Sequence, residues 1–280
     1  MIEKVVVGWD SSEGAESAVD WALSRPHSET LVLVQIDNEI ALEETFAAGS
    51  PAATARIDLM EKAESVRNRH PDRTVHTELV QGDTVASLAA FSSPSTLVAV
   101  GTRHSTGRRP RRSWSVGARV AATAKGPVAV IPHPLTDGGG PIVVGVDDPE
   151  ESALLFAAEE AARTGRTLRP VRAWEGPPLW PGQTEHDADY LESLAEMYRN
   201  LVTDAMESIL VRYPDLLLEP IVERGAPADV LLEAARGAGM LVVGNRGFRG
   251  IKRFFLGSVS QAVVLSAAVP TVVVNSDTRT

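Results

Sequence analysis

The feature that most constrains this chain is an internal duplication, in which four short segments recur in the same order in both halves. The matched pairs are residues 4–10 with 141–147, 80–85 with 223–230, 97–103 with 241–246, and 126–131 with 269–274. Four matches in the same order and at nearly the same spacing do not arise easily by chance. The sequence therefore predicts two tandem copies of one domain, each about 135–140 residues long.

The two copies differ slightly in length. Their first segments are offset by 137 positions (Asp10 to Asp147), but their later segments are offset by 143. Six additional residues therefore lie between Asp147 and Gly225. We expect them in residues 175–183 (EGPPLWPGQ), because proline and glycine are typical of loops that accept insertions.

A stretch of turn-forming residues separates the copies. Residues 132–141 read PHPLTDGGGP, a composition that suits a linker and neither a helix nor a strand. We therefore expect a first domain at residues 1–134 and a second at residues 141–280.

Each copy alternates short apolar runs with helical patterns, which predicts a doubly wound α/β domain. The strand runs are almost continuously apolar, as expected for a parallel sheet covered on both faces. Asp148 and Pro149 are a typical helix start, with a carboxylate cap followed by a proline. In the second copy we expect strands near residues 142–147, 168–174, 218–223, 240–244 and 271–275, and helices near 149–164, 188–212, 227–237 and 257–268.

Composition narrows the possible partners. The formal charge of −10 disfavours nucleic acid and anionic membranes as partners of the whole surface. The chain has no cysteine, which removes disulfides and thiolate sites and fits a cytoplasmic location. No apolar run approaches the roughly 20 residues of a membrane span, and the start lacks a secretory signal pattern. The run from Arg108 to Arg112 is a local exception that either holds an anion or is a solvated loop.

The segment most informative about chemistry is residues 244–260, GNRGFRGIKRFFLGSVS. It leaves a strand, passes through a glycine-bearing loop and enters a helix near Gly257 and Ser258. Glycines allow close backbone approach to an anion, and the free N–H groups of a helix start attract negative charge. The segment therefore suits a phosphate, although a simple turn before a helix has the same pattern.

Asp147 is the second element of this candidate site. It ends the first strand of its copy, where a doubly wound sheet opens its ligand crevice at the carboxyl ends of the strands. Asp10 holds the equivalent position in the first copy. The alternative for Asp147 is a helix cap.

These residues resemble the universal stress protein family. The pattern G-x2-G-x9-G-S in Gly244, Gly247, Gly257 and Ser258 is similar to the nucleotide motif of that family. The segments VVGVD, GAPADVLL and VPTVVV resemble it at matching positions, so the resemblance covers nearly the whole chain. It implies a five-stranded parallel sheet of order 3-2-1-4-5 in each copy.

The family includes ATP-binding members, so the resemblance implies a role in stress response or signalling with ATP as ligand, alone or with Mg²⁺. It also implies that the copies pack through residues 128–131 and 271–275, as an intramolecular pseudo-dimer, and that whole chains could pair as a homodimer. Asp147 and the backbone near Ala173 are then expected beside the adenosine, and Gly244 near the ribose. Gly247, Gly257 and Ser258 are expected near the phosphates, and Arg246 and Val259 are also implied as nucleotide-binding residues.

The first copy departs from this pattern. Gly101 and Ser115 are retained, but His104 replaces the second glycine and Trp114 replaces the third. A tryptophan at the start of the helix would fill the volume that a phosphate needs. We therefore expect the first copy to bind nucleotide weakly or not at all.

No catalytic or metal-binding motif is evident. The chain has no G-x-x-x-x-G-K-[S/T], H-E-x-x-H or G-x-S-x-G, so we expect nucleotide binding without catalysis. Two alternatives stay open: a slow ATP hydrolase or phosphotransferase, and an interaction scaffold that binds no nucleotide. The cluster Glu185, His186, Asp187 and Asp189 is either a metal site or, as we expect, a charged loop entering a helix. Trp9, Trp21, Trp174 and Trp180 are expected to pack, with Trp174 and Trp180 as alternative lid residues.

Overall fold

The computed structural model describes residues 2–25, 29–37, 51–103, 115–136, 139–147, 152–176, 187–245 and 256–275. Each half contributes five strands and four helices to these ranges. The strands are β1 (Lys4–Trp9), β2 (Thr30–Asp37), β3 (Val75–Gln81), β4 (Thr96–Arg103), β5 (Val128–His133), β6 (Ile142–Gly145), β7 (Leu168–Trp174), β8 (Ile221–Arg224), β9 (Met240–Asn245) and β10 (Thr271–Asn275). The helices are α1 (Glu13–Ser24), α2 (Pro51–Arg69), α3 (Thr84–Ala90), α4 (Val116–Thr123), α5 (Ser152–Thr164), α6 (Ala188–Arg212), α7 (Pro227–Ala234) and α8 (Ser258–Ser266).

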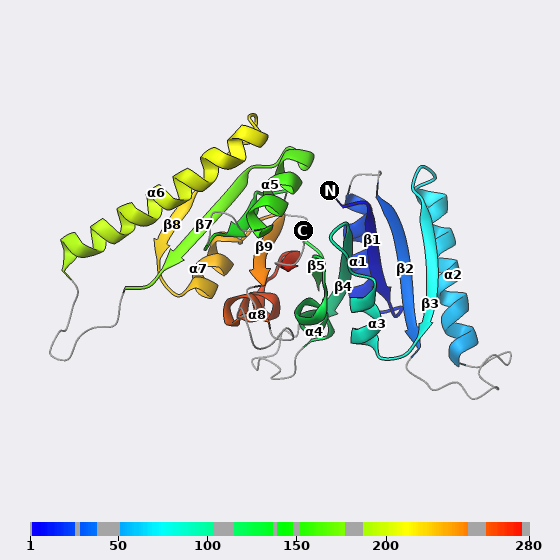
Figure 1. Ribbon diagram of the computed structural model, residues 1–280. Helices are drawn as coiled ribbons and strands as arrows, with labels where there is room; N and C mark the ends of the chain where they lie inside the picture. Colours follow the sequence, from blue (N-terminus) through cyan, green and yellow to red (C-terminus); the bar gives the residue numbers. More distant parts are fainter. Residues whose placement is uncertain are drawn as a thin grey trace.

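The strands form one ten-stranded sheet that runs through both halves. Its order is β3-β2-β1-β4-β5-β10-β9-β6-β7-β8, so each half has the predicted order 3-2-1-4-5. Pairing is parallel within each half and antiparallel between β5 and β10, where Val272 lies opposite Ala129. The expected tandem α/β fold and the expected pairing of the final strands are both confirmed (Figure 1).

Helices cover both faces of the sheet, which explains the continuously apolar strands. Along β10, Val272 and Val274 belong to the core under α1, α2, α5 and α6, whereas Val273 faces the core under the other four helices. Each of these three valines is at most 2% exposed. Burial of alternate residues on opposite faces is the pattern of a sheet sandwiched between helical layers.

Most of the predicted position of the six additional residues, 177–183, lies outside the described residues. The described part of α2 begins at Pro51, and α6 begins at Ala188. The ends of the two helices, Arg69 and Arg212, are offset by 143. Helix α6 has 25 residues, compared with 19 in the described part of α2.

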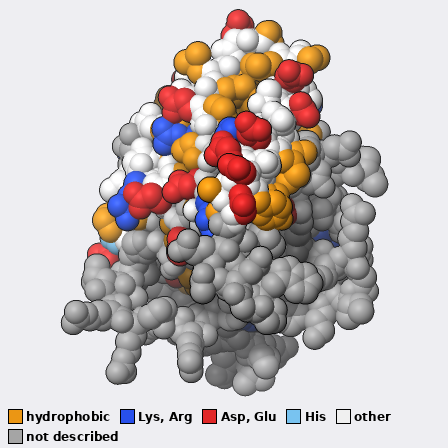
Figure 2. Space-filling model, turned by 90° about the vertical axis from the view of Figure 1, so that its left-hand side faces the viewer, with side chains coloured by type: hydrophobic (Ala, Val, Ile, Leu, Met, Phe, Trp, Pro, Cys, Tyr) orange, Lys and Arg blue, Asp and Glu red, His pale blue; other side chains and the backbone are white. Residues whose placement is uncertain are grey.

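The buried residues of α6 begin at Val202 and end at Ile209. Tyr190, Met197 and Leu201, which precede them along the helix, are exposed. Figure 2 views the molecule from the side on which α6 lies, where hydrophobic and acidic side chains share the described surface. Although α6 is long, no helix in the described part of the chain is apolar enough to cross a membrane.

A buried ion pair joins the halves on the α1–α5 side of the sheet. The guanidinium of Arg25, just after α1, donates two hydrogen bonds of 2.9 Å to the carboxylate of Glu160 in α5. Arg25 also pairs with Glu29, and Arg163 donates to Glu160 at 2.5 Å. Burial alone would raise the pKa of Glu160, but attraction from Arg25 and Arg163 lowers it. The carboxylate is therefore held in its charged form at the junction.

Candidate functional site

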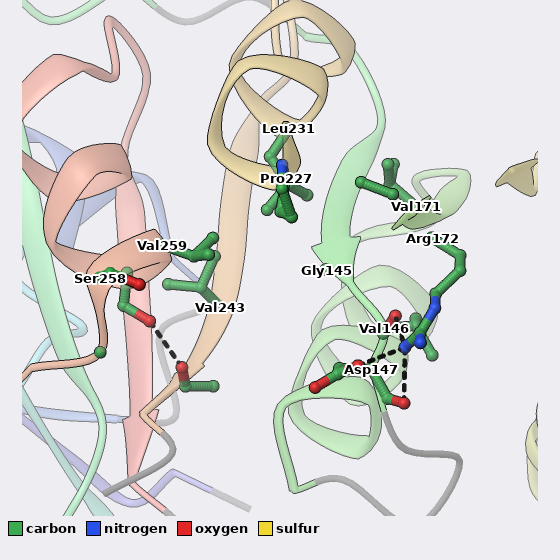
Figure 3. Close-up of a pocket in the computed structure, with 14 residues that line it drawn as sticks. Gly145, Val146, Asp147, Val171, Arg172, Pro227, Leu231, Val243, Ser258 and Val259 are labelled. Atoms are coloured by element: carbon green, nitrogen blue, oxygen red, sulfur yellow. Dashed lines mark hydrogen bonds and ion pairs between the residues drawn. The ribbon is translucent and has the colours of Figure 1, made fainter. Parts of the chain in front are cut away.

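A pocket of about 340 Å³ opens at the carboxyl ends of β6, β7 and β9, the expected crevice of the second domain. Six of the eight residues implied by the sequence line it, and Arg246 and Gly247 lie outside the described residues. Figure 3 shows the lining side chains gathered from both sides of the opening. The lining residues are Gly145, Val146, Asp147, Val171, Arg172, Ala173, Pro227, Leu231, Val243, Gly244, Gly257, Ser258, Val259 and Ser260.

One end of the pocket carries the paired charges of Asp147 and Arg172 (Figure 3). Nη1 of Arg172 donates to the Asp147 carboxylate at 2.5 Å and to the Asp147 carbonyl oxygen at 2.6 Å. The guanidinium of Arg172 also lies 4.9 Å from the ring centroid of Tyr198 in α6. The Asp147 side chain is 62% exposed, so its carboxylate remains accessible from the pocket while Arg172 orients it.

The opposite end of the pocket is the start of α8. Gly257 is the N-cap residue, and no side chain caps this helix within the described residues. The N–H groups of the first turn, at Ser258 and Val259, therefore lack a side-chain acceptor in the described part of the chain. The hydroxyl of Ser260 donates to the carbonyl oxygen of Gly244 at 2.7 Å, which ties the first turn to the end of β9.

A second helix also starts at this pocket. Helix α7 begins at Pro227, and its N-cap residue, Ala226, makes no side-chain capping hydrogen bond. Pro227 has no N–H group to satisfy, and its ring and the side chain of Leu231 line the pocket. The pocket thus combines an apolar wall from α7 with the polar start of α8.

The corresponding helices of the first domain cap themselves. At α4, Ser115 Oγ accepts a hydrogen bond from the Ala118 N–H at 3.2 Å. At α3, Asp83 Oδ1 accepts from the Ala86 N–H at 2.8 Å. An N–H group already bonded to its own cap is less available to an external anion. The two domains therefore differ at both helix starts, although they share one fold.

Other first-domain residues that are equivalent to site residues of the second domain have local structural roles. The Asp10 carboxylate accepts from the Ser12 N–H at 3.1 Å, in the turn that starts α1. A Cβ atom on Gly101 would lie 1.8 Å from the carbonyl oxygen of Gly14, so close helix packing alone requires a glycine there. His104 and Trp114, on which the predicted loss of the first site depends, lie outside the described residues.

The remaining candidate residues have structural roles where they are described. Trp9, Trp21 and Trp174 are each at most 6% exposed, which confirms packing roles, and Trp180 lies outside the described residues. The Asp187 carboxylate accepts from the N–H groups of Asp189 and Tyr190, so it caps α6 as a charged loop entering a helix would. Among the described residues no group of acidic or histidine side chains could hold a metal. The basic run at 108–112, Asp148, Pro149, Glu185 and His186 also lie outside the described ranges.

The sequence did not single out several residues that line the pocket. Arg172 is the most consequential of them, because it pairs with Asp147. Its position near the end of β7, immediately before Ala173, was the available signal, because the carboxyl ends of the strands face the crevice. Ser260 gave a weaker signal as the second serine of the GSVS segment.

Comparison with known proteins gives a consistent result over both halves. The model of the universal stress protein family matches residues 1–132 and 140–275. A universal stress protein of Mycobacterium bovis is 29% identical, with 96% of this chain and 94% of the relative aligned. One from Mycobacterium tuberculosis is 30% identical, with 96% and 95% aligned. A solved universal stress protein from Archaeoglobus fulgidus shares the fold, with a TM-score of 0.66, 18% identity and 98% of each chain covered.

Proposed function

This chain belongs to the universal stress protein family, and we propose that it binds ATP in the pocket of its second domain. The observation that carries the proposal is the start of α8, which has no side-chain cap among the described residues and faces the pocket at Gly257 and Ser258, while the equivalent helix start at Ser115 is self-capped. Backbone N–H groups in this arrangement are suited to phosphate oxygens.

The dimensions and lining of the pocket support a nucleotide ligand. Its volume of about 340 Å³ lies in the usual range for small-molecule sites, and its walls are mostly apolar with a few polar groups. Val171, Pro227 and Leu231 offer apolar surface to a base or sugar, and Asp147 offers a hydrogen-bond acceptor. We place the adenosine at this end and the phosphates at α8.

The energetics suit moderate affinity. Three or four charge-assisted hydrogen bonds, at roughly 1.5–3 kcal/mol each before ordering costs, could support binding near the micromolar range. Between Gly244 and Gly257 the sequence also carries four basic residues, Arg246, Arg249, Lys252 and Arg253. Basic residues this close in sequence to the start of α8 favour the more highly charged nucleotide, so we propose ATP, with or without Mg²⁺, rather than AMP.

We propose binding without turnover as the activity, in a cytoplasmic stress-response or signalling role. Asp147 and Arg172 are the titratable side chains among the described lining residues, and they are paired with each other. A paired carboxylate is a poor general base until its partner moves.

Titration calorimetry of the full chain with ATP tests the proposal. We expect one ATP bound per chain, and incubation with labelled ATP and magnesium should give no turnover that survives stringent purification. An absence of heat with ATP would refute the proposed ligand and favour the scaffold alternative. Turnover that is lost in Gly257→Trp would favour the hydrolase or phosphotransferase.

A further inference from the structure

We infer that the first domain holds the phosphate end of the second domain's pocket in place through Asn275 and Asn245. This inference rests on the proposed function, because it concerns the same pocket. It assigns positioning roles to two residues that do not line the pocket and gives the first domain a part in binding.

The two asparagines connect the domain junction to the start of α8. Asn275 ends β10 and is 7% exposed, and its Nδ2 donates to the carbonyl oxygens of Gly126 at 3.0 Å and Ala121 at 3.4 Å. Both carbonyls belong to the first domain. Asn275 Oδ1 accepts from Nδ2 of Asn245, which ends β9, at 2.8 Å. Asn245 Oδ1 in turn accepts from the Gly257 N–H at 3.4 Å.

The backbone groups at the two ends fix the direction of this chain of hydrogen bonds. Carbonyl oxygens of the first domain can only accept, so Asn275 must turn its NH₂ group toward them. Its oxygen then faces Asn245, which must donate with its own NH₂ group. The Asn245 oxygen is left toward Gly257, whose N–H can only donate. One orientation of both amides therefore satisfies every partner.

This arrangement affects the anion end of the pocket selectively. Gly257 is the N-cap of α8, so a bond to its N–H helps to set where the following N–H groups of Ser258 and Val259 point. A site organised before its ligand arrives binds more tightly than one that must be ordered on binding. Asp147, at the other end, is oriented by its bonds to Arg172 of β7 instead.

The first domain cannot make the same connection in reverse. Thr102 stands at the position of Asn245, and Pro132 stands at the position of Asn275, as the strand register shows. Proline has no side-chain donor or acceptor, and the Thr102 hydroxyl is 3.5 Å from the carbonyl oxygen of Ile131 in its own domain. The first domain therefore stabilises the pocket of the second domain through these hydrogen bonds, and the second domain makes no equivalent bonds through Thr102 and Pro132.

Titration calorimetry with two ligands tests this role. The parent protein is compared with Asn275→Ala and with Asn245→Thr, which introduces the residue found at position 102. We expect about three- to tenfold weaker ATP binding in both variants, the worth of one ordinary hydrogen bond. Binding of adenosine, which has no phosphate, should not change. Glu160→Gln is the matched control, because it weakens the domain junction on the opposite face of the sheet and should keep the parent's affinity for ATP.

Each outcome separates the inference from its alternatives. Parent-like ATP affinity in a folded Asn275→Ala or Asn245→Thr protein would overturn it. Equal losses of adenosine and ATP affinity, or an equal loss in Glu160→Gln, would also overturn it, because the effect would then be general loosening. If Asn275→Ala does not fold, Asn245→Thr decides alone. A parent protein that binds neither ligand refutes the proposed function itself before any variant is compared.

Discussion

Giving α8 its own cap should stabilise the protein and weaken ATP binding at the same time. Gly257 has φ −57° and ψ 152°, nearly the values of Ser115 at the start of α4, φ −62° and ψ 155°. Any L-amino acid can adopt this conformation, so the backbone does not require glycine at 257. Gly257→Asp should therefore fold and place a carboxylate on the first-turn N–H groups.

Stability and ATP affinity are expected to change in opposite directions. An aspartate cap in place of glycine adds a few tenths of a kcal/mol, and its charge at the helix start adds a similar amount, so the free energy of unfolding should rise by about 0.5–1 kcal/mol. ATP binding should lose at least one charge-assisted hydrogen bond and gain repulsion from the carboxylate. The affinity should fall by at least about 10- to 100-fold.

Urea unfolding and titration calorimetry on the same preparations measure both effects. Ser115→Gly is the matched control, because it removes the cap of α4 and should lower stability by a few tenths of a kcal/mol without changing ATP affinity. Parent-like ATP affinity in Gly257→Asp would refute the reasoning, since it would show that the phosphates do not use the start of α8.

Three further outcomes follow from the same geometry. Gly257→Trp, which copies Trp114 of the first domain, should abolish ATP binding in calorimetry while circular dichroism shows an intact fold. Asp147→Ala should weaken adenosine and ATP binding to the same extent, because the carboxylate lies at the nucleoside end; a loss for ATP alone would contradict that placement. Glu160→Gln should lower the free energy of unfolding at pH 7 by about 2–3 kcal/mol, since Glu29 still pairs with Arg25. The difference should be complete above pH 4.5, the ordinary pKa of the carboxyl, and shrink at more acid pH, because the folded-state pKa is lowered; a difference that grows on acidification would contradict this.

The pattern of residues was sufficient to predict the tandem α/β architecture, because its signals are local and appear twice. Continuously apolar runs such as residues 271–275 predict buried parallel strands, and the structure has strand β10 there. The strand order was implied by the family resemblance and not by the pattern of residues. The predicted position of the insertion, in the breaker residues at 175–183, stays a prediction, because most of that segment lies outside the described residues.

The site could be predicted in outline for a similar reason. Its glycine and serine pattern is continuous in sequence, and Asp147 lies at a strand end where ligands bind. The partners of these residues were not predictable, because they come from distant parts of the chain. Arg172 pairs with Asp147 across 25 positions, and Asn245 meets Asn275 across 30. Beyond their positions at strand ends, nothing local marks these polar side chains as partners.

The difference between the two domains also depends on geometry that single residues only suggest. Ser115 and Ser258 hold equivalent positions in the two copies. Ser115 is the N-cap residue of α4, outside the helix, whereas Ser258 is the first helical residue of α8. The preceding glycine at 257 therefore takes the N-cap position without providing an acceptor. This shift of one residue leaves the first N–H groups of α8 without a side-chain cap in the part of the chain that the structure describes.

A crystal structure of the full chain grown with ATP tests the central claim most directly. We expect one nucleotide per chain, in the second domain, with phosphate oxygens within hydrogen-bonding distance of the N–H groups of Ser258 and Val259. An empty second pocket at saturating ATP, or a nucleotide bound in the first domain alone, would contradict the account.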